Sequence, residues 1–269
     1  MFSKMKLIMT KNKTIFSVAV FAVLSITLVQ AQKKDKKEKT YQKLDNYYVL
    51  EKYDKCIDEA QSMQLDDKLS KDVEPYLYAA MGYLGVYRNP DKYPLKKYED
   101  FKDPLRKALS NFGKFRKRDK TGDAFAEQQT FATDLKNETF MMMADLQEKN
   151  DKTKMGSYSR EIAKAFPDDG VMMLLSGAYL VASGNAGDGL KNADAGYKML
   201  DSLSTAGQFK PSEQETKALS NSFIIYTDYL SELKEKPKEN KEKAKKFIAL
   251  AEKLLPEDSN IKEQSTKLN

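Results

Sequence analysis

Apolar residues recur at helical spacing along nearly the whole chain after residue 40. Separations of three, four and seven positions place each set on one face of an amphipathic helix. The clearest sets are Tyr53, Cys56, Ile57, Ala60 and Met63; Leu219, Phe223, Tyr226, Leu230 and Leu233; and Ala244, Phe247, Ile248, Ala251 and Leu254. After the first 32 residues, no segment shows the sustained alternation of a strand. The sequence therefore predicts an all-α fold.

Turn-forming residues divide the chain into helices. Asp103 and Pro104 favour a helix start, because aspartate caps free N–H groups and proline fits the first helical position. Pro167 to Gly170 and the GNAGDG run at 184–189 favour turns between helices. We expect about ten helices in five hairpins: 40–51 with 53–65, 74–87 with 97–118, 124–149 with 152–166, 171–183 with 188–206, and 212–234 with 240–255. No low-complexity linker interrupts this array, so we expect one helical domain over 40–269.

The segment KAKKFIALAEKLLPEDS has the spacing of a helical hairpin that ends in proline. Ala244 and Ala251 are small where two helices would approach, with the bulky Ile248 between them, and Pro256 follows. Partial versions occur at Ala108 and Phe112; at Ile162, Pro167 and Gly177; and at Leu44, Tyr47, Cys56 and Ala60. This pattern resembles the tetratricopeptide repeat and related α-solenoids. The resemblance implies stacked hairpins that present a concave surface to a peptide or protein.

The spacing of the hairpins departs from that of a regular repeat. Five hairpins in the residues after Ala31 average about 48 residues each, against roughly 34 for the regular repeat. The insertion at 87–98, YRNPDKYPLKKY, is long. A tetratricopeptide-like right-handed solenoid and an irregular helical bundle are both compatible with the sequence.

The first 32 residues have the composition of a secretory signal peptide. Four lysines and no acid precede an uncharged, mostly apolar run from Ile15 to Val29, and Val29-Gln30-Ala31 follows as a cleavage junction. We expect residues 1–31 to be removed. The Ala-Gln junction resembles those of exported proteins of Gram-negative bacteria, which implies the periplasm. The alternative is an uncleaved anchor, because the uncharged segment at 14–32 approaches the ~20 residues of a spanning helix.

Removal of residues 1–31 leaves the chain nearly neutral. The full chain has 46 lysines and arginines against 40 acids, and loss of four lysines leaves a net charge of +2. Nucleic-acid binding needs a strong basic footprint, so we do not expect a nucleic-acid partner. Residues 33–39, KKDKKEK, remain locally basic. We expect 32–39 to form a disordered charged leader, with contact to anionic lipid headgroups as the alternative.

The chain contains no histidine and one cysteine, which narrows the catalytic classes. Ser-His-Asp and Cys-His catalysis and histidine-ligated zinc are excluded. Cys56 falls on an apolar stripe, which predicts a buried, inert thiol. The acid pairs at 66–67 and 168–169 lack the spacing of a calcium loop, and the glycines at 184–189 lack that of a phosphate loop. We expect ordinary turns there, no metal, no cofactor and no enzyme. A carboxylate-dependent hydrolase is the remaining catalytic alternative.

Tyrosines cluster on the predicted helix at 74–87. Tyr76, Tyr83 and Tyr87 lie near one another by helical spacing. The first helices of tetratricopeptide-like hairpins line the concave face, and tyrosine combines broad contact area with a polar tip. These three residues are therefore candidate partner-binding residues. The alternative is that they pack against adjacent hairpins.

The densest basic cluster ends the predicted helix at 97–118. Arg116 and Arg118 belong to it, and cations there complement the negative end of the helix dipole. The alternative is that the two arginines bind an acidic peptide or a phosphate group, so they are also candidate partner-binding residues. Three consecutive methionines at 141–143 cannot all face one core, so we expect at least one to be partly exposed.

These patterns together predict an exported, periplasmic helical-repeat adaptor. We expect it to bind another envelope protein or peptide as a non-catalytic scaffold. The alternative is a membrane-tethered subunit of an envelope assembly, held by the segment at 14–32. Membrane contact is expected only if that segment is uncleaved.

Overall fold

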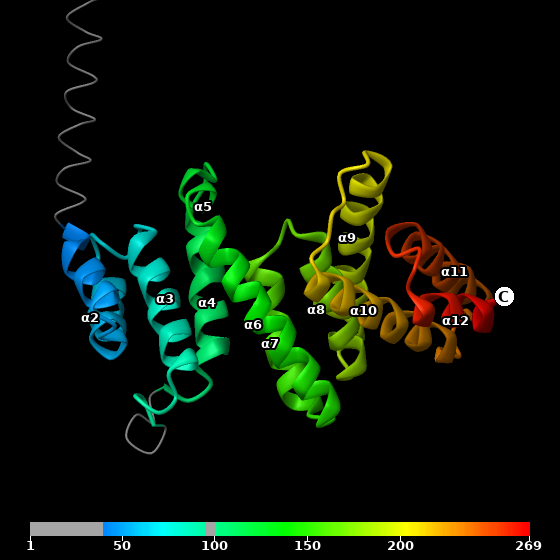
Figure 1. The fold of residues 1–269 in the computed structure, drawn as a ribbon, viewed down its shortest axis with the longest axis horizontal. Coiled ribbons are helices and arrows are strands. Elements are labelled where there is room, and N and C mark those ends of the chain that lie inside the picture. Colours follow the sequence, from blue (N-terminus) through cyan, green and yellow to red (C-terminus); the bar gives the residue numbers. More distant parts are fainter. Residues whose placement is uncertain (1–39, 95–100) are drawn as a thin grey trace, which may run out of the picture. The chain divides into compact units, whose positions relative to one another are not determined.

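The computed structural model describes residues 40–94 and 101–269 (Figure 1). The predicted signal peptide and charged leader, residues 1–39, lie outside the described residues. The chain divides after Lys52 into two compact units. In the first unit, the described residues form one helix over 40–49. A turn follows this helix, and in it Glu51 adopts a positive φ of 52°.

The second unit is built from helices joined by short turns. They are α2 (Tyr53–Leu65), α3 (Glu74–Arg88), α4 (Pro104–Arg118), α5 (Asp123–Ala126), α6 (Gln129–Glu148), α7 (Lys152–Ala165), α8 (Gly170–Ala182), α9 (Ala186–Thr205), α10 (Glu213–Glu232), α11 (Pro237–Leu254) and α12 (Ser259–Leu268). No strand occurs within 40–94 or 101–269, which confirms the all-α prediction. Across the same residues, no helix has both the length and the apolar character needed to cross a bilayer.

Neighbouring helices pack in series along the second unit. Helix α2 packs on α3, and α3 packs on α4. Helix α4 then contacts α7, which lies against α8, while α6 lies to one side and reaches α4, α7 and α10. Helix α8 packs on both α9 and α10, α10 packs on α11, and α12 covers the end of this pair. The predicted pairings of 74–87 with 97–118, 124–149 with 152–166, 171–183 with 188–206 and 212–234 with 240–255 are all present.

Helix α8 forms the centre of the core. Its sequence, GVMMLLSGAYLVA, is apolar on every face, and each residue from Gly170 to Val181 is buried. This composition fits its position, because α7, α9 and α10 surround it. The contact with α9 is close: a Cβ atom added to Gly177 would lie 2.4 Å from the backbone nitrogen of Ala193. Gly177 thus occupies the small-residue position that the sequence indicates for the first helix of a hairpin.

The structure corrects two predicted helices and adds a third. Helix α4 begins at Pro104, the proline that the sequence indicates as a first helical position, but Asp103 has a left-handed φ of 56° and makes no side-chain cap. The helix start expected at 97–100 lies outside the described residues. The helix expected over 124–149 is two helices, α5 and α6, separated at Glu127 and Gln128. Helix α12 was not predicted, since its ten residues, SNIKEQSTKL, bury only Ile261, Gln264 and Leu268.

Candidate binding cavity

The tyrosines singled out from the sequence are mostly buried. Tyr83 is only 2% exposed. Its hydroxyl accepts a hydrogen bond of 2.7 Å from Gln61 Nε2, and its ring meets Phe101 edge to face. Tyr76 is also buried, and its hydroxyl donates to the carbonyl of Ser70. These positions favour the core-packing alternative, and partner binding through this helix stays a prediction.

Tyr87 is half-buried beside α6. Its partial burial raises the pKa of its phenol, and the nearby carboxylates of Glu138 and Asp145 raise it further. The adjacent Arg88 is held by two carboxylates of α6: its Nε donates to Glu138 at 2.7 Å and its Nη1 to Asp134 at 3.2 Å. The end of α3 is therefore fixed to α6 by charge as well as by packing.

The structure does not bring Arg116 and Arg118 together. Arg118 turns toward α3, where its guanidinium carbon lies 3.7 Å from the ring centre of Tyr76 and its Nη2 donates to the Tyr76 hydroxyl at 2.7 Å. Arg116 lies over the Phe125 ring at 3.3 Å, and its Nη2 donates to both carboxylate oxygens of Asp168. Each arginine thus joins helices, which leaves no paired-arginine site for a phosphate group.

Other sequence expectations can be placed directly. Cys56 is fully buried, as predicted for an inert thiol. Of the three methionines, Met143 is buried and Met141 is 51% exposed, which confirms that the run cannot face one core. Within 40–94 and 101–269, no three potential metal-ligating side chains gather in a group that could hold a metal ion.

A cavity of about 360 Å³ lies where α6 faces the starts of α8 and α10. We call it the first cavity. Its wall is formed by Phe125, Gln129, Ala132, Thr133, Lys136, Phe166, Asp168, Asp169, Gly170, Val171, Leu200, Leu203, Gln208, Phe209, Lys210, Pro211 and Glu215. Aromatic and aliphatic side chains alternate with polar ones. This volume and mixed lining are typical of a site that holds a few side chains of a ligand.

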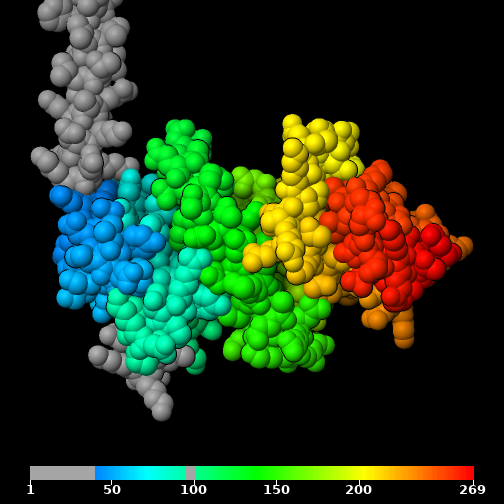
Figure 2. All heavy atoms as spheres, in the orientation of Figure 1, coloured from blue at the N-terminus to red at the C-terminus, as the bar shows by residue number. Residues whose placement is uncertain are grey.

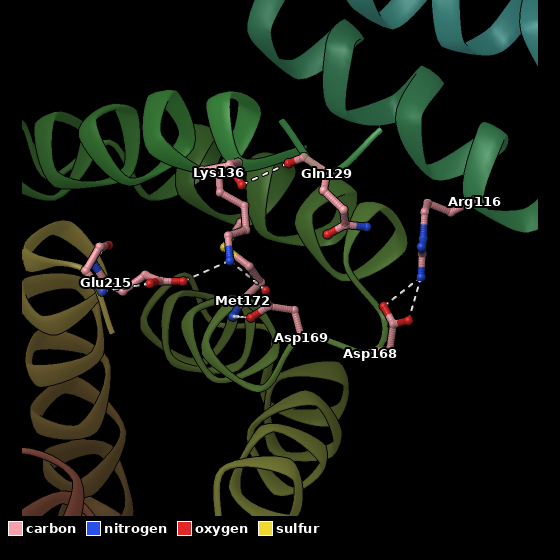
Figure 3. Close-up of polar contacts among 9 residues, drawn as sticks. Arg116, Gln129, Lys136, Asp168, Asp169, Met172 and Glu215 are labelled. Atoms are coloured by element: carbon pink, nitrogen blue, oxygen red, sulfur yellow. Dashed lines mark hydrogen bonds and ion pairs between the residues drawn. The ribbon is translucent and has the colours of Figure 1, made fainter. Parts of the chain in front are cut away.

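Three charged residues form a polar wall of the first cavity (Figure 3). They are Lys136, Asp169 and Glu215, and we call them the lysine bridge. The Lys136 Nζ atom on α6 donates to Asp169 Oδ2 and to Glu215 Oε1, both at 2.8 Å. The Lys136 side chain is only 17% exposed. One lysine therefore ties α6 to the N-termini of both α8 and α10.

Each carboxylate of the lysine bridge also serves a helix start. Asp169 Oδ1 accepts the Met172 backbone N–H at 3.1 Å and so caps α8. Glu215 Oε2 accepts the Ser212 N–H at 2.9 Å, and the Ser212 hydroxyl accepts the Glu215 N–H, which completes a capping box on α10. Both carboxylates thus divide their two oxygens between a cap and the ammonium of Lys136.

Electrostatics keeps Lys136 and Glu215 ionised. Burial alone would raise the pKa of Glu215, but hydrogen bonds from Lys136 and Ser212 and the lysine charge lower it below the ordinary value. Burial alone would lower the pKa of Lys136, and the attraction of Asp169 and Glu215 raises it instead. A carboxylate with a lowered pKa is a poor general acid at neutral pH.

Sequence reasoning missed this site for identifiable reasons. Lys136 lies in a polar stretch of α6, and its partners are 33 and 79 residues away, so no local pattern joins them. Asp168 and Asp169 were expected only to form a turn. One signal was readable: Ser212 and Glu215 have the S-x-x-E spacing of a capping box, which marks the start of α10.

A second cavity of about 350 Å³ adjoins the first at Pro211, which lines both. Its other lining residues are Thr216, Leu254, Leu255, Pro256, Glu257 and Asp258.

Comparison of this chain with protein-family models, with curated proteins and with solved structures finds no match.

Proposed function

We propose that this protein is an exported helical-repeat adaptor that binds a segment of another envelope protein in the first cavity. The observation that carries the proposal is the cavity itself, about 360 Å³ between α6 and the starts of α8 and α10. Its wall offers half-buried aromatic surface from Phe125 and Phe209 beside exposed amides at Gln129 and Gln208. Apolar surface contributes affinity, and the amides can satisfy the N–H and C=O groups of a bound chain.

The charges of the cavity favour binding over catalysis. Asp169 and Glu215 are both occupied by Lys136 and by helix caps, while Asp168 is held by Arg116. A hydrolase that works with two carboxylates needs one to carry a proton near neutral pH. The lowered pKa of Glu215 argues against that role. We therefore infer a non-catalytic scaffold and keep the hydrolase only as a disfavoured alternative.

A pair of threonines on α6 allows a matched test of binding. Thr133 lines the first cavity, whereas Thr130, which is also exposed on the same helix, lies outside the lining. A photo-cross-linking amino acid at Thr133 should form an adduct with an identifiable envelope protein in intact cells, and the same group at Thr130 should not. The identified partner, once purified, should bind Thr133→Trp at least about tenfold more weakly than Thr130→Trp. Equal affinities would contradict the proposal.

One measurement distinguishes an exported protein with a cleaved signal peptide from a membrane-tethered subunit. If the expected signal peptide is removed, mass spectrometry of the purified protein should give an N-terminus at Gln32. A chain that retains Lys13 and is recovered with membranes would instead support the tethered subunit, with the helical unit and its cavity unchanged.

A further inference from the structure

The two cavities lie on two sides of the start of α10. Glu215 lines the first cavity, and the next residue, Thr216, lines the second, while Pro211 belongs to both. Figure 2 shows the segment after α9 (yellow) on the surface between the green helices and the red C-terminal helices. A helix is about 10 Å across, so a chain that crosses the start of α10 covers that distance in about three extended residues. One extended segment can therefore reach both cavities.

Both cavities accept apolar side chains. The first presents Phe125, Phe166 and Phe209, and the second presents Leu254, Leu255 and Pro256. Two apolar anchors spaced about three residues apart could enter one cavity each. Such paired anchors in pockets are the usual source of affinity when a protein binds an extended segment.

The charges around the two cavities favour a cationic ligand. Five carboxylates line the walls: Asp168, Asp169, Glu215, Glu257 and Asp258. Among the described residues, Lys136 and Lys210 are the cations of these linings. Lys136 already binds Asp169 and Glu215, and Arg116 binds Asp168, so Glu257 and Asp258 are the carboxylates left to attract a cation of a ligand. The chain after residue 31 carries a net charge of +2, so this excess of acid is local.

The longest ion pair among the lining carboxylates lies at the second cavity. No cation among the described residues belongs to the lining of this cavity. Asp258 is occupied as the cap of α12, since its Oδ1 accepts the N–H groups of Asn260 and Ile261. The Glu257 side chain is 95% exposed, and its nearest ion-pair partner, Lys262 Nζ, is 3.7 Å away. That distance is too long for a strong hydrogen bond, which leaves Glu257 able to meet a cation of a ligand.

This inference rests on the proposed function. We propose that the two cavities bind an extended peptide segment of a partner protein, in which two apolar side chains are followed by lysine or arginine. The apolar side chains enter the two cavities on either side of Pro211. The cationic side chains lie over Glu257 and Asp258 at the second cavity.

Two labelled peptides test the charge and the anchors together. Both are ten-residue, fluorescein-labelled peptides with leucines three positions apart in an alanine and glycine background; one ends in Lys-Lys and the other in Glu-Glu. By fluorescence anisotropy with the mature protein, the Lys-Lys peptide should bind at least about tenfold more tightly at low salt. The difference should shrink as salt rises, because the charges involved are exposed.

Two exposed glutamates provide the variant and its control. Glu257→Lys should abolish the preference for the Lys-Lys peptide, whereas Glu263→Lys, on α12 and outside both linings, should keep it. Both side chains are exposed, so both variants should fold, which thermal unfolding by circular dichroism checks. A preference that survives Glu257→Lys would overturn the inference. So would equal binding of the two peptides.

The outcomes also separate this inference from the proposed function. If both peptides bind equally and Thr133→Trp blocks them, the cavity binds segments and only the cationic preference is wrong. If neither peptide binds and the cross-linker at Thr133 captures no partner, the proposed function fails as well. If sedimentation shows a dimer that Thr133→Trp abolishes, a second copy of this chain occupies the cavities and the inference is overturned.

Discussion

The contact of α8 with α9 and the contact of α6 with its neighbours represent two different ways of joining helices. In the first, glycines bring the backbones together: a Cβ on Gly177 would lie 2.4 Å from Ala193 N, and one on Gly196 would lie 2.5 Å from Leu174 N. In the second, α6 approaches the starts of α8 and α10 across a cavity, and the long side chain of Lys136 spans the gap.

This difference assigns separate roles to packing and to charge. Where helices touch through glycine and alanine, no room remains for a ligand, and the contact contributes only to stability. Where a lysine and two carboxylates span the gap, the helices are held in place while a cavity stays open beside them. The loosely packed interface is therefore the one we expect to bind.

The largest effect should come from adding one methyl group at the close contact. Gly177→Ala places its Cβ against backbone atoms of Ala193, which cannot rotate away, so α8 and α9 must separate. We expect a loss of about 3 kcal/mol in the free energy of unfolding, measured by urea denaturation. Gly187→Ala on α9 is the control, because nothing lies within 4 Å of the added Cβ. That variant should be neutral or more stable by up to about 1 kcal/mol.

A second substitution asks whether close packing extends to the last predicted hairpin. Ala251 is fully buried on α11, at the small-residue position recognised in the sequence. Ala251→Leu should overpack this junction and cost ~1–3 kcal/mol, visible as a lower melting temperature. Unchanged thermal stability would show that the helices do not meet closely there.

Breaking the lysine bridge should have a smaller effect. Lys136→Met keeps most of the apolar length of the side chain but leaves Asp169 and Glu215 facing each other without the ammonium between them. A cost of about 1–2 kcal/mol is expected, between the values typical of exposed and of buried ion pairs. Lys217→Met removes an exposed pair with Glu213 and should leave the free energy of unfolding nearly unchanged. Equal costs would show that the lysine bridge is no stronger than a surface pair.

The smallest effect should appear in the loss of stability at low pH. The pKa of Glu215 is lowered in the folded protein, so its contribution is present above the ordinary value of 4.5 and is lost as pH falls through the folded value. Glu215→Gln cannot ionise and should lose less stability than the wild type as the pH falls below the ordinary value of 4.5. Because the bridge is partly exposed to water, the difference should stay below about 1 kcal/mol. Parallel curves for the two proteins would remove Glu215 from the acid response.

The close contact of α8 with α9 could be predicted from sequence, and the cavity could not. Gly177 stands at a small-residue position among apolar residues, and such spacings encode helix contacts locally. Ala244 and Ala251 are buried, and close packing at these two residues stays a prediction. The break between α5 and α6 falls at Glu127 and Gln128, where neither glycine nor proline gives a signal. The lysine bridge depends on tertiary placement, since Lys136 meets a carboxylate 79 residues away. A charged residue on a solvated helix face and one in a half-buried ion pair have the same local sequence pattern.

The burial of α8 has a consequence for the order in which the chain folds and opens. Its partners α7 and α9 adjoin it in sequence, so their contacts close short loops and should form early. Amide hydrogens of α8 should then be the last to exchange with deuterium, while those of α12, a short helix that buries three side chains, should exchange among the first. The unit should lose its C-terminal end long before its centre opens.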